Sequence, residues 1–224
     1  MDKRLQKTAG IFGIAEGVIY IIAFIFYGSL NYPNSDSTIN QKLNFLIENQ
    51  LGFLIINFIS YILFGIILSV LVLGIYHRLK NNDKILSQIT AIFGLIWVVL
   101  VIASGMIENI GLNSVIEIGN KNPEKAMMIS STINIITEGI GGGNEIVGGI
   151  WVLLLSITSL KGNLFYKPLN YLGVFIGIIG ILTTYPLDIF KEIFGVSQIV
   201  WFIWIGFYMV LNPLLKNTYK PESI

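Results

Sequence analysis

The stretch "TEGIGGGNEIVGGIW", Thr137–Trp151, places Glu138 and Glu145 among six glycines at the start of a strongly apolar run. A carboxylate in an apolar environment can bind a proton or a cation, and glycine allows a neighbouring helix to approach closely. On one continuous helix the two glutamates would share a face with four of the glycines, because the spacings are three, four or seven residues. The glycines that we expect to pack on this face are Gly141, Gly142, Gly148 and Gly149. The other interpretation of the glycine run is a break of the helix at Gly141–Gly143, which would leave free backbone groups beside Glu145.

Further acidic and amide residues occur in other apolar runs. Glu108 and Asn109 end the third run, and Glu16 lies in the first run with Gly13, Tyr20 and Ala23 on its helical face. We expect a polar ligand or ion pathway in which Glu108 and Glu138 lie near the outer rim and Glu145 lies a few turns deeper, with Glu16 about two turns below this cluster. The amides assigned to the same pathway are Asn144 and Asn109.

The role of a buried glutamate has several possible explanations at this stage. The predicted spans contain no lysine or arginine, so the acid must be neutral and hydrogen-bonded, hydrated in a cavity, or bound to an external cation. A structural role would pair Glu145 with Asn134, Asn144, a threonine or backbone carbonyls. The other roles are proton or cation binding, and recognition of a lipid headgroup or small molecule.

Catalytic chemistry has little support in the composition. The chain has one histidine, His77, and no cysteine, which excludes the usual metal sites built from several His or Cys ligands. The four aspartates lie in predicted loops or at span ends, and "GIGGGNE" lacks the lysine of a phosphate-binding loop. We therefore expect no enzyme activity, no metal and no cofactor.

The elements that carry these residues are membrane spans. The 224 residues are 54% hydrophobic and 12% charged, with a mean hydropathy of +0.75, whereas soluble domains carry about 25% charged residues. Lipid offers the backbone no hydrogen-bond partners, so the spans must be helices, and the runs do not alternate as barrel strands would. The sequence predicts an all-α bundle in one domain, residues 1–224, with six spans at about 8–30, 52–76, 85–109, 140–160, 169–187 and 195–215.

Basic residues predict the orientation of these spans. Ten of the fourteen lysines and arginines fall at the two termini and in the second-to-third and fourth-to-fifth loops, and four fall on the opposite side. The positive-inside rule then places both termini in the cytoplasm of a prokaryotic cell. The first run is too long for a signal peptide and lacks a small-residue cleavage site. A short interfacial helix is expected at "NQKLNFLIENQLGF", and the fourth helix is expected to start early, with Pro123 in its first turn.

Two classes of function remain open. Weak similarity between "GIAEGVIYI" and "GGNEIVGGI" suggests an inverted repeat, which is common in transporters. We favour a transporter for a small solute, a cation or protons. The alternative is a noncatalytic scaffold or lipid-binding protein, whose ligand is a headgroup or a partner helix. Either class works in a lipid bilayer, does not bind nucleic acid, and allows a homodimer through the glycine stripes.

Four segments resemble a known family. They are "KTAGIFGIAEGVIYII", "GGGNEIVGGIWVLLLS", "KPLNYLGVFIGIIGILTTYP" and "FGVSQIVWFIWIGFYMV". The chain resembles uncharacterised prokaryotic membrane proteins related to the domain-of-unknown-function 4386 family over nearly its whole length. The resemblance implies an integral membrane protein of six helices, and it implies no activity, ligand or catalytic residue.

Overall fold

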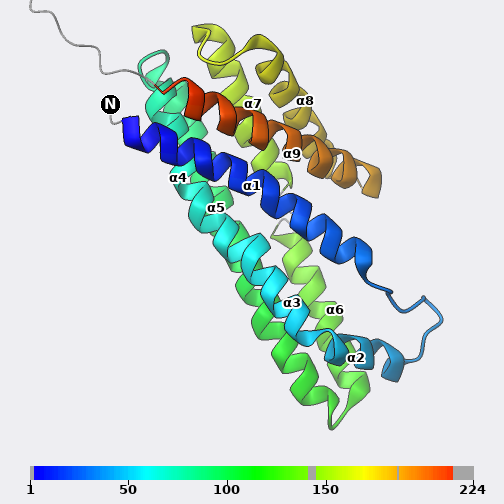
Figure 1. Ribbon diagram of the computed structural model, residues 1–224. Coiled ribbons are helices and arrows are strands. Elements are labelled where there is room, and N and C mark those ends of the chain that lie inside the picture. The colour runs from blue at the N-terminus through cyan, green and yellow to red at the C-terminus, as the bar shows by residue number, and fades with distance from the viewer. Residues whose placement is uncertain (1–2, 141–144, 186, 214–224) are drawn as a thin grey trace, which may run out of the picture.

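The computed structural model describes residues 3–140, 145–185 and 187–213. These residues form helices joined by short turns, which confirms the all-α prediction (Figure 1). The helices are α1 (Lys3–Ser29), α2 (Ile39–Glu48), α3 (Gln50–Asn57), the π-helix η1 (Phe58–Leu63), α4 (Phe64–Leu79), α5 (Lys84–Gly119), α6 (Pro123–Gly139), α7 (Glu145–Gly162), α8 (Lys167–Leu182) and α9 (Asp188–Leu211).

Polar residues define where several helices begin. The Thr38 side chain accepts a hydrogen bond from the backbone N–H of Gln41, whose side chain bonds back to Thr38, forming a capping box at α2. Asp83 accepts from Leu86 N at 3.0 Å at the start of α5. Asn122 accepts from Lys125 N at 3.0 Å and precedes a proline in the first turn of α6, where the missing N–H has no cost.

Five helical segments of the described chain are long and apolar enough to cross a membrane. They are α1, the continuous run α3–η1–α4, α5, α7 and α9. With 36 residues, α5 is about 54 Å long, well beyond the roughly 30 Å of a hydrocarbon core. α8 has 16 residues and is shorter than the other spans. The chain is therefore a multi-pass helical membrane protein.

One end of the molecule holds the beginning of α1, the end of α9 and the α4–α5 and α7–α8 turns; we call it the termini end (Figure 1). Arg78 Nη2 donates to the backbone oxygen of Asn212 at 2.8 Å, and Gln6 Nε2 donates to Gly74 O at 2.7 Å. Asn82 Nδ2 donates to Thr158 O at 3.1 Å. These bonds tie all four segments together at this end.

The opposite end is a small helical cap made of α2, α3, the second half of α5 and α6 (Figure 1). It has its own apolar cluster of Leu43, Val115 and Ala126. α7, α8 and α9 lie toward the termini end, so the cap extends beyond them along α5.

Between the two ends lies an aromatic layer. Trp97 packs on Trp151 with ring centroids 5.6 Å apart, and Trp151 packs on Trp201 at 5.7 Å. Phe202 stacks on Trp97 at 6.1 Å, and Phe64 packs edge-on to Phe202 at 5.9 Å. All five side chains are buried. Bulky rings therefore fill the bundle below the cap.

Several helices have bounds that differ from those of the predicted spans. The third predicted span stops at residue 109, and α5 continues to Gly119 into the cap. The fourth was predicted from about residue 140, with a break at Gly141–Gly143 as an alternative; α6 ends at Gly139 and α7 begins at Glu145. The sixth was predicted to begin at residue 195, but α9 begins at Asp188, so Lys191 belongs to a helix. Apolar runs alone do not show where a helix leaves the bilayer.

Candidate functional site

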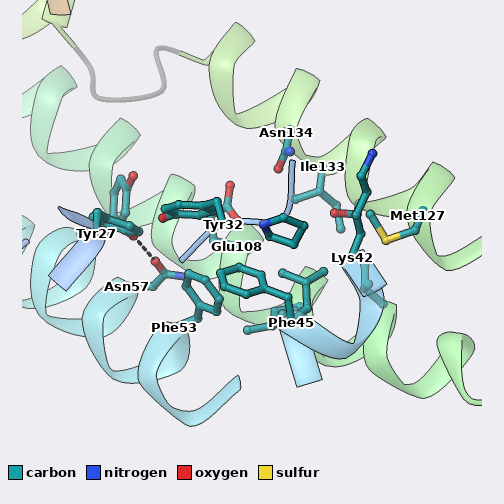
Figure 2. A pocket seen from close by; sticks show the side chains of 16 residues that line it. Tyr27, Tyr32, Lys42, Phe45, Phe53, Asn57, Glu108, Met127, Ile133 and Asn134 are labelled. Atoms are coloured by element: carbon teal, nitrogen blue, oxygen red, sulfur yellow. Dashed lines mark hydrogen bonds between the residues drawn. The ribbon is translucent and has the colours of Figure 1, made fainter. Parts of the chain in front are cut away.

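The cap holds a partly open cavity of about 460 Å³, the cap cavity, which is bounded by α1, α2, α3, η1, α5 and α6 and by the segment that joins α1 to α2 (Figure 2). This volume is within the range of small-molecule sites. Sixteen residues line it: Tyr27, Tyr32, Pro33, Lys42, Phe45, Leu46, Phe53, Asn57, Tyr61, Glu108, Leu112, Val115, Met127, Ser130, Ile133 and Asn134.

Aromatic rings form one wall of the cap cavity. Tyr32 and Phe45 have ring centroids 5.3 Å apart, and Phe45 and Phe53 are 5.9 Å apart. Figure 2 shows these rings gathered around the middle of the cavity, close to Glu108. Partial burial raises the pKa of the Tyr32 phenol, so this hydroxyl stays protonated at neutral pH. The wall therefore presents π faces and a phenol to anything in the cavity.

The polar groups of the cap cavity include the Glu108 carboxylate, two side-chain amides and the Lys42 ammonium group. Tyr27 donates its hydroxyl to Asn57 Oδ1 at 3.0 Å (Figure 2). Lys42 donates to the backbone oxygen of Ser35 at 2.9 Å and lies at one side of the cavity. Glu108 is half-buried, and neither ion pair among the described residues involves it.

A second cavity of about 190 Å³, the bundle cavity, adjoins the first toward the aromatic layer. Tyr27 and Tyr61 line both cavities. The bundle cavity also holds Glu145, Lys191 and Ser60, and the Ser60 hydroxyl is buried with no hydrogen-bond partner among the described residues. Its far wall is Tyr20, Phe64 and Trp97.

Glu138 lies near this site but on its surface. Its Oε2 accepts a hydrogen bond from Lys191 Nζ at 2.9 Å, and 62% of the Glu138 side chain is exposed. The expectation that Glu138 and Glu145 share one helix face was wrong, because they belong to α6 and α7. Glu108 lines the cap cavity and Glu145 lines the adjoining bundle cavity. Glu138 bonds Lys191, which also lines the bundle cavity, so the three predicted acids lie around the two cavities.

One lysine lies near two of the predicted acids, although among the described residues it forms no ion pair with a buried one. Lys191 lies in the first turns of α9, where it contacts Glu138 and lines the cavity of Glu145. The sequence hid this because the lysine precedes the apolar part of the sixth run.

Glu16 is separate from both cavities. It is fully buried, and neither carboxyl oxygen has a hydrogen-bond partner among the described residues. It lies one helical turn from Tyr20, which does line the bundle cavity.

The other predicted site residues that the structure describes lie at contacts between helices and line neither cavity. Asn109 Nδ2 donates to Leu54 O at 3.2 Å, tying α5 to α3, and it lines neither cavity. A Cβ on Gly149 would lie 2.9 Å from Gly180 Cα, and one on Gly148 would lie 2.8 Å from the Trp97 ring, so both glycines are at close helix contacts. Gly141, Gly142 and Asn144 lie outside the described residues.

Sequence reasoning missed most of the cap cavity. Its aromatic and amide residues, such as Tyr32, Phe45, Asn57 and Asn134, come from six elements: α1, the α1–α2 segment, α2, α3, η1 and, much later in the chain, α6. The one local signal was the density of aromatic and polar residues in "YGSLNYP" and "NQKLNFLIENQLGF". That signal indicates polar surroundings but not which residues meet.

Comparison with models of protein families shows which family the chain belongs to. The model of a family described as a domain of unknown function, DUF4386, matches residues 8–212. The chain belongs to the DUF4386 family. The match runs from α1 to the end of α9, so this DUF4386 protein carries both cavities within the matched region. No curated protein and no solved structure matches the chain.

Proposed function

We propose that this DUF4386 protein is a noncatalytic transporter that takes a small ammonium-bearing solute from the cap side of the membrane. The observation that supports this most strongly is Glu108, a carboxylate without an ionic partner among the described residues, beside the aromatic wall of the cap cavity. Aromatic faces attract cations, and quaternary ammonium groups are bound in this way.

The charges of the cavity narrow the solute class. Glu108 offers a partner for an ammonium group, and Lys42 offers one for a carboxylate or phosphate at the side of the same cavity. Two amides, Asn57 and Asn134, can orient polar groups between them. A zwitterion of this kind matches more of the lining than a bare inorganic cation does.

The membrane orientation belongs to the same proposal. The termini end carries most of the basic residues, among them Arg78, Lys80 and Lys161, so it faces the cytoplasm of a prokaryotic plasma membrane. The cap then faces outward. α8 serves as the sixth span despite its length, since a short helix is accommodated by local thinning of the bilayer.

The arrangement of cavities supports transport from the cap side. Solute in the cap cavity would meet Glu145 and Lys191 of the bundle cavity next. Beyond them the layer of Trp97, Trp151 and Trp201 closes the bundle. Alternating access requires one side open and the other closed around a site, and this conformation corresponds to the outward-open state.

The test is binding and flux with the full-length protein in liposomes. The probes are choline, glycine betaine, tetramethylammonium and potassium ions, with acetate as an anionic control. We expect saturable binding of the ammonium compounds, accumulation inside the liposomes, and loss of both in Glu145→Gln or Glu108→Gln. Binding without flux would remove the transport proposal, and the absence of any binding would remove the solute site.

A noncatalytic scaffold or lipid-binding protein is favoured by a different observation. The cap exposes large apolar side chains, including Ile110 at 63%, Met128 at 72% and Ile135 at 72%. Such a surface suits lipid tails or a second chain, including another copy of this one. If the protein copurifies with a stoichiometric lipid or dimer partner, and shows no flux, this alternative is the better account.

A further inference from the structure

We propose that Glu16 is a proton-binding site inside the bundle, and that protons reach it from the bundle cavity past the Tyr20 hydroxyl. The use of this proton would be to couple proton movement to solute movement, and this part of the inference rests on the proposed function. The site itself is argued from burial and contacts around Glu16.

The helix packing isolates Glu16 from lipid and water. A Cβ on Gly13 would lie 3.1 Å from Gly206 Cα, and a Cβ on Gly17 would lie 3.2 Å from Ile199 O. The backbones of α1 and α9 therefore touch on both sides of Glu16, whose exposed fraction is 0%. An ionised carboxylate without partners is very costly in such a place, so the acid is held in its neutral, protonated form.

The neighbours of Glu16 offer no charge that would stabilise the anion. On α4 the titratable groups are at the termini end, and on α9 they are at the two ends of the helix. The nearest titratable group along α1 is Tyr20, one turn away on the same face, and η1, which also packs on α1, carries Tyr61. The distant groups are Tyr76, His77 and Arg78 on α4, Asp188, Lys191, Glu192 and Tyr208 on α9, and Lys3, Arg4 and Lys7 on α1.

Tyr20 connects this acid to the cavities. Its ring packs on Phe64 at 5.6 Å and on Phe202 at 6.0 Å, at the edge of the aromatic layer. It also lines the bundle cavity together with Tyr61 and Glu145. Tyr20 is thus one helical turn from Glu16 and also lines the polar cavity.

Other buried polar groups extend from the same region. Gln198 on α9 is fully buried, and neither its oxygen nor its nitrogen has a partner among the described residues. The same holds for the indole nitrogens of Trp97, Trp151 and Trp201. Buried polar atoms are almost always hydrogen-bonded, so this concentration of unpaired groups indicates a centre built for a transient hydrogen-bonding guest.

The step conserves atoms and charge. The Glu16 carboxylate binds one H⁺ to give a neutral carboxylic acid, and release returns the H⁺ toward the bundle cavity. Tyr20 takes part by accepting a proton on its oxygen while it gives up its own, so it is unchanged after each passage. It is a positioning residue for the proton route.

The test is infrared difference spectroscopy of the full-length protein in liposomes, without any solute. We expect a carbonyl stretching band of a protonated carboxylic acid at neutral pH, lost in Glu16→Gln and retained in Glu192→Gln, an exposed acid on α9. Glu16→Gln replaces a neutral acid with a neutral amide of the same shape, so it should fold. A spectrum unchanged by Glu16→Gln would overturn the site.

The route has its own measurement, the rate at which that band shifts after transfer to D₂O. Tyr20→Phe should slow the shift by roughly tenfold or more, while Tyr171→Phe on the exposed face of α8 should leave it unchanged. Equal rates in both variants would contradict passage by Tyr20. Because no solute is present, this result is independent of whether the cap cavity binds ammonium compounds.

Discussion

Glu108 and Glu145 line neighbouring cavities, and each shares its cavity with one lysine, Lys42 for Glu108 and Lys191 for Glu145. At the scale of single residues, one acid and one lysine in each cavity determine which charged groups of a solute that cavity attracts. Lys191 also bonds the exposed Glu138 at 2.9 Å, so its charge is partly occupied. Lys42 bonds only a backbone oxygen, that of Ser35, and its charge remains available to a solute.

Removing the charge of Glu108 tests the solute site. Glu108→Gln should weaken binding of ammonium compounds roughly 10- to 100-fold, because a hydrogen bond to a charged group contributes about 1.5–3 kcal/mol. Isothermal titration of the reconstituted protein measures this. Glu117→Gln, an exposed acid two turns further along α5, is the matched control and should bind like the wild type. Equal affinity in both variants would show that the ammonium group does not contact Glu108.

At the scale of elements, the close glycine contact between α7 and α8 predicts a packing defect. In Gly149→Ala the new Cβ would lie 2.9 Å from Gly180 Cα and 3.2 Å from Gly177 O. Backbone atoms cannot move aside as a side chain does, so we expect a loss of about 1–3 kcal/mol in the free energy of unfolding. Thermal unfolding in detergent measures it. Gly28→Ala, which has no atom within 4 Å of its Cβ, should show no loss.

The π-helix η1 fixes the register of α3 relative to α4, so a deletion within it should change that register. Its extra residue per turn sets the rotation of α3 relative to α4, and such insertions are frequent at functional sites. Deleting Phe58 would convert the turn to α-helix and rotate Asn57 by about 100°, breaking its 3.0 Å bond with Tyr27.

Solute binding should therefore fall roughly tenfold or more in the deletion variant. Phe58→Ala, which removes the same half-exposed side chain but keeps the chain length, should bind normally. Equal losses in both variants would show that the side chain matters and the register does not.

The sequence predicted the spans better than the site, for physical reasons. Long apolar runs such as "IWVVLVIA" require membrane helices, so α5 was predicted correctly at its start. Its extension to Gly119 was missed because Asn113, Ser114 and Glu117 interrupt the apolar run after residue 109. Glu108 and Glu145 were found because acids are rare in apolar runs. Tyr32 and Phe53 were not, because aromatic residues are common in such runs and only the fold brings these together.

At the scale of the whole molecule, we predict that the cap faces outward and that the termini end faces the cytoplasm. The chain has no cysteine, so single cysteines can be placed freely. Ser35→Cys at the cap end should react with a membrane-impermeant maleimide in intact cells, and Asn81→Cys in the α4–α5 turn should react only after permeabilisation. Both positions are exposed. Labelling of Asn81→Cys in intact cells, with Ser35→Cys protected, would show the opposite orientation.

The central claim is that the cap cavity delivers an ammonium-bearing solute across the membrane. The most direct measurement is uptake of radiolabelled choline or glycine betaine into liposomes that contain the wild type, Glu108→Gln or Glu117→Gln. The account predicts saturable uptake by the wild type and by Glu117→Gln, and uptake near the level of empty liposomes in Glu108→Gln. Uptake that is equal in all three proteins, or absent from all of them, would contradict it.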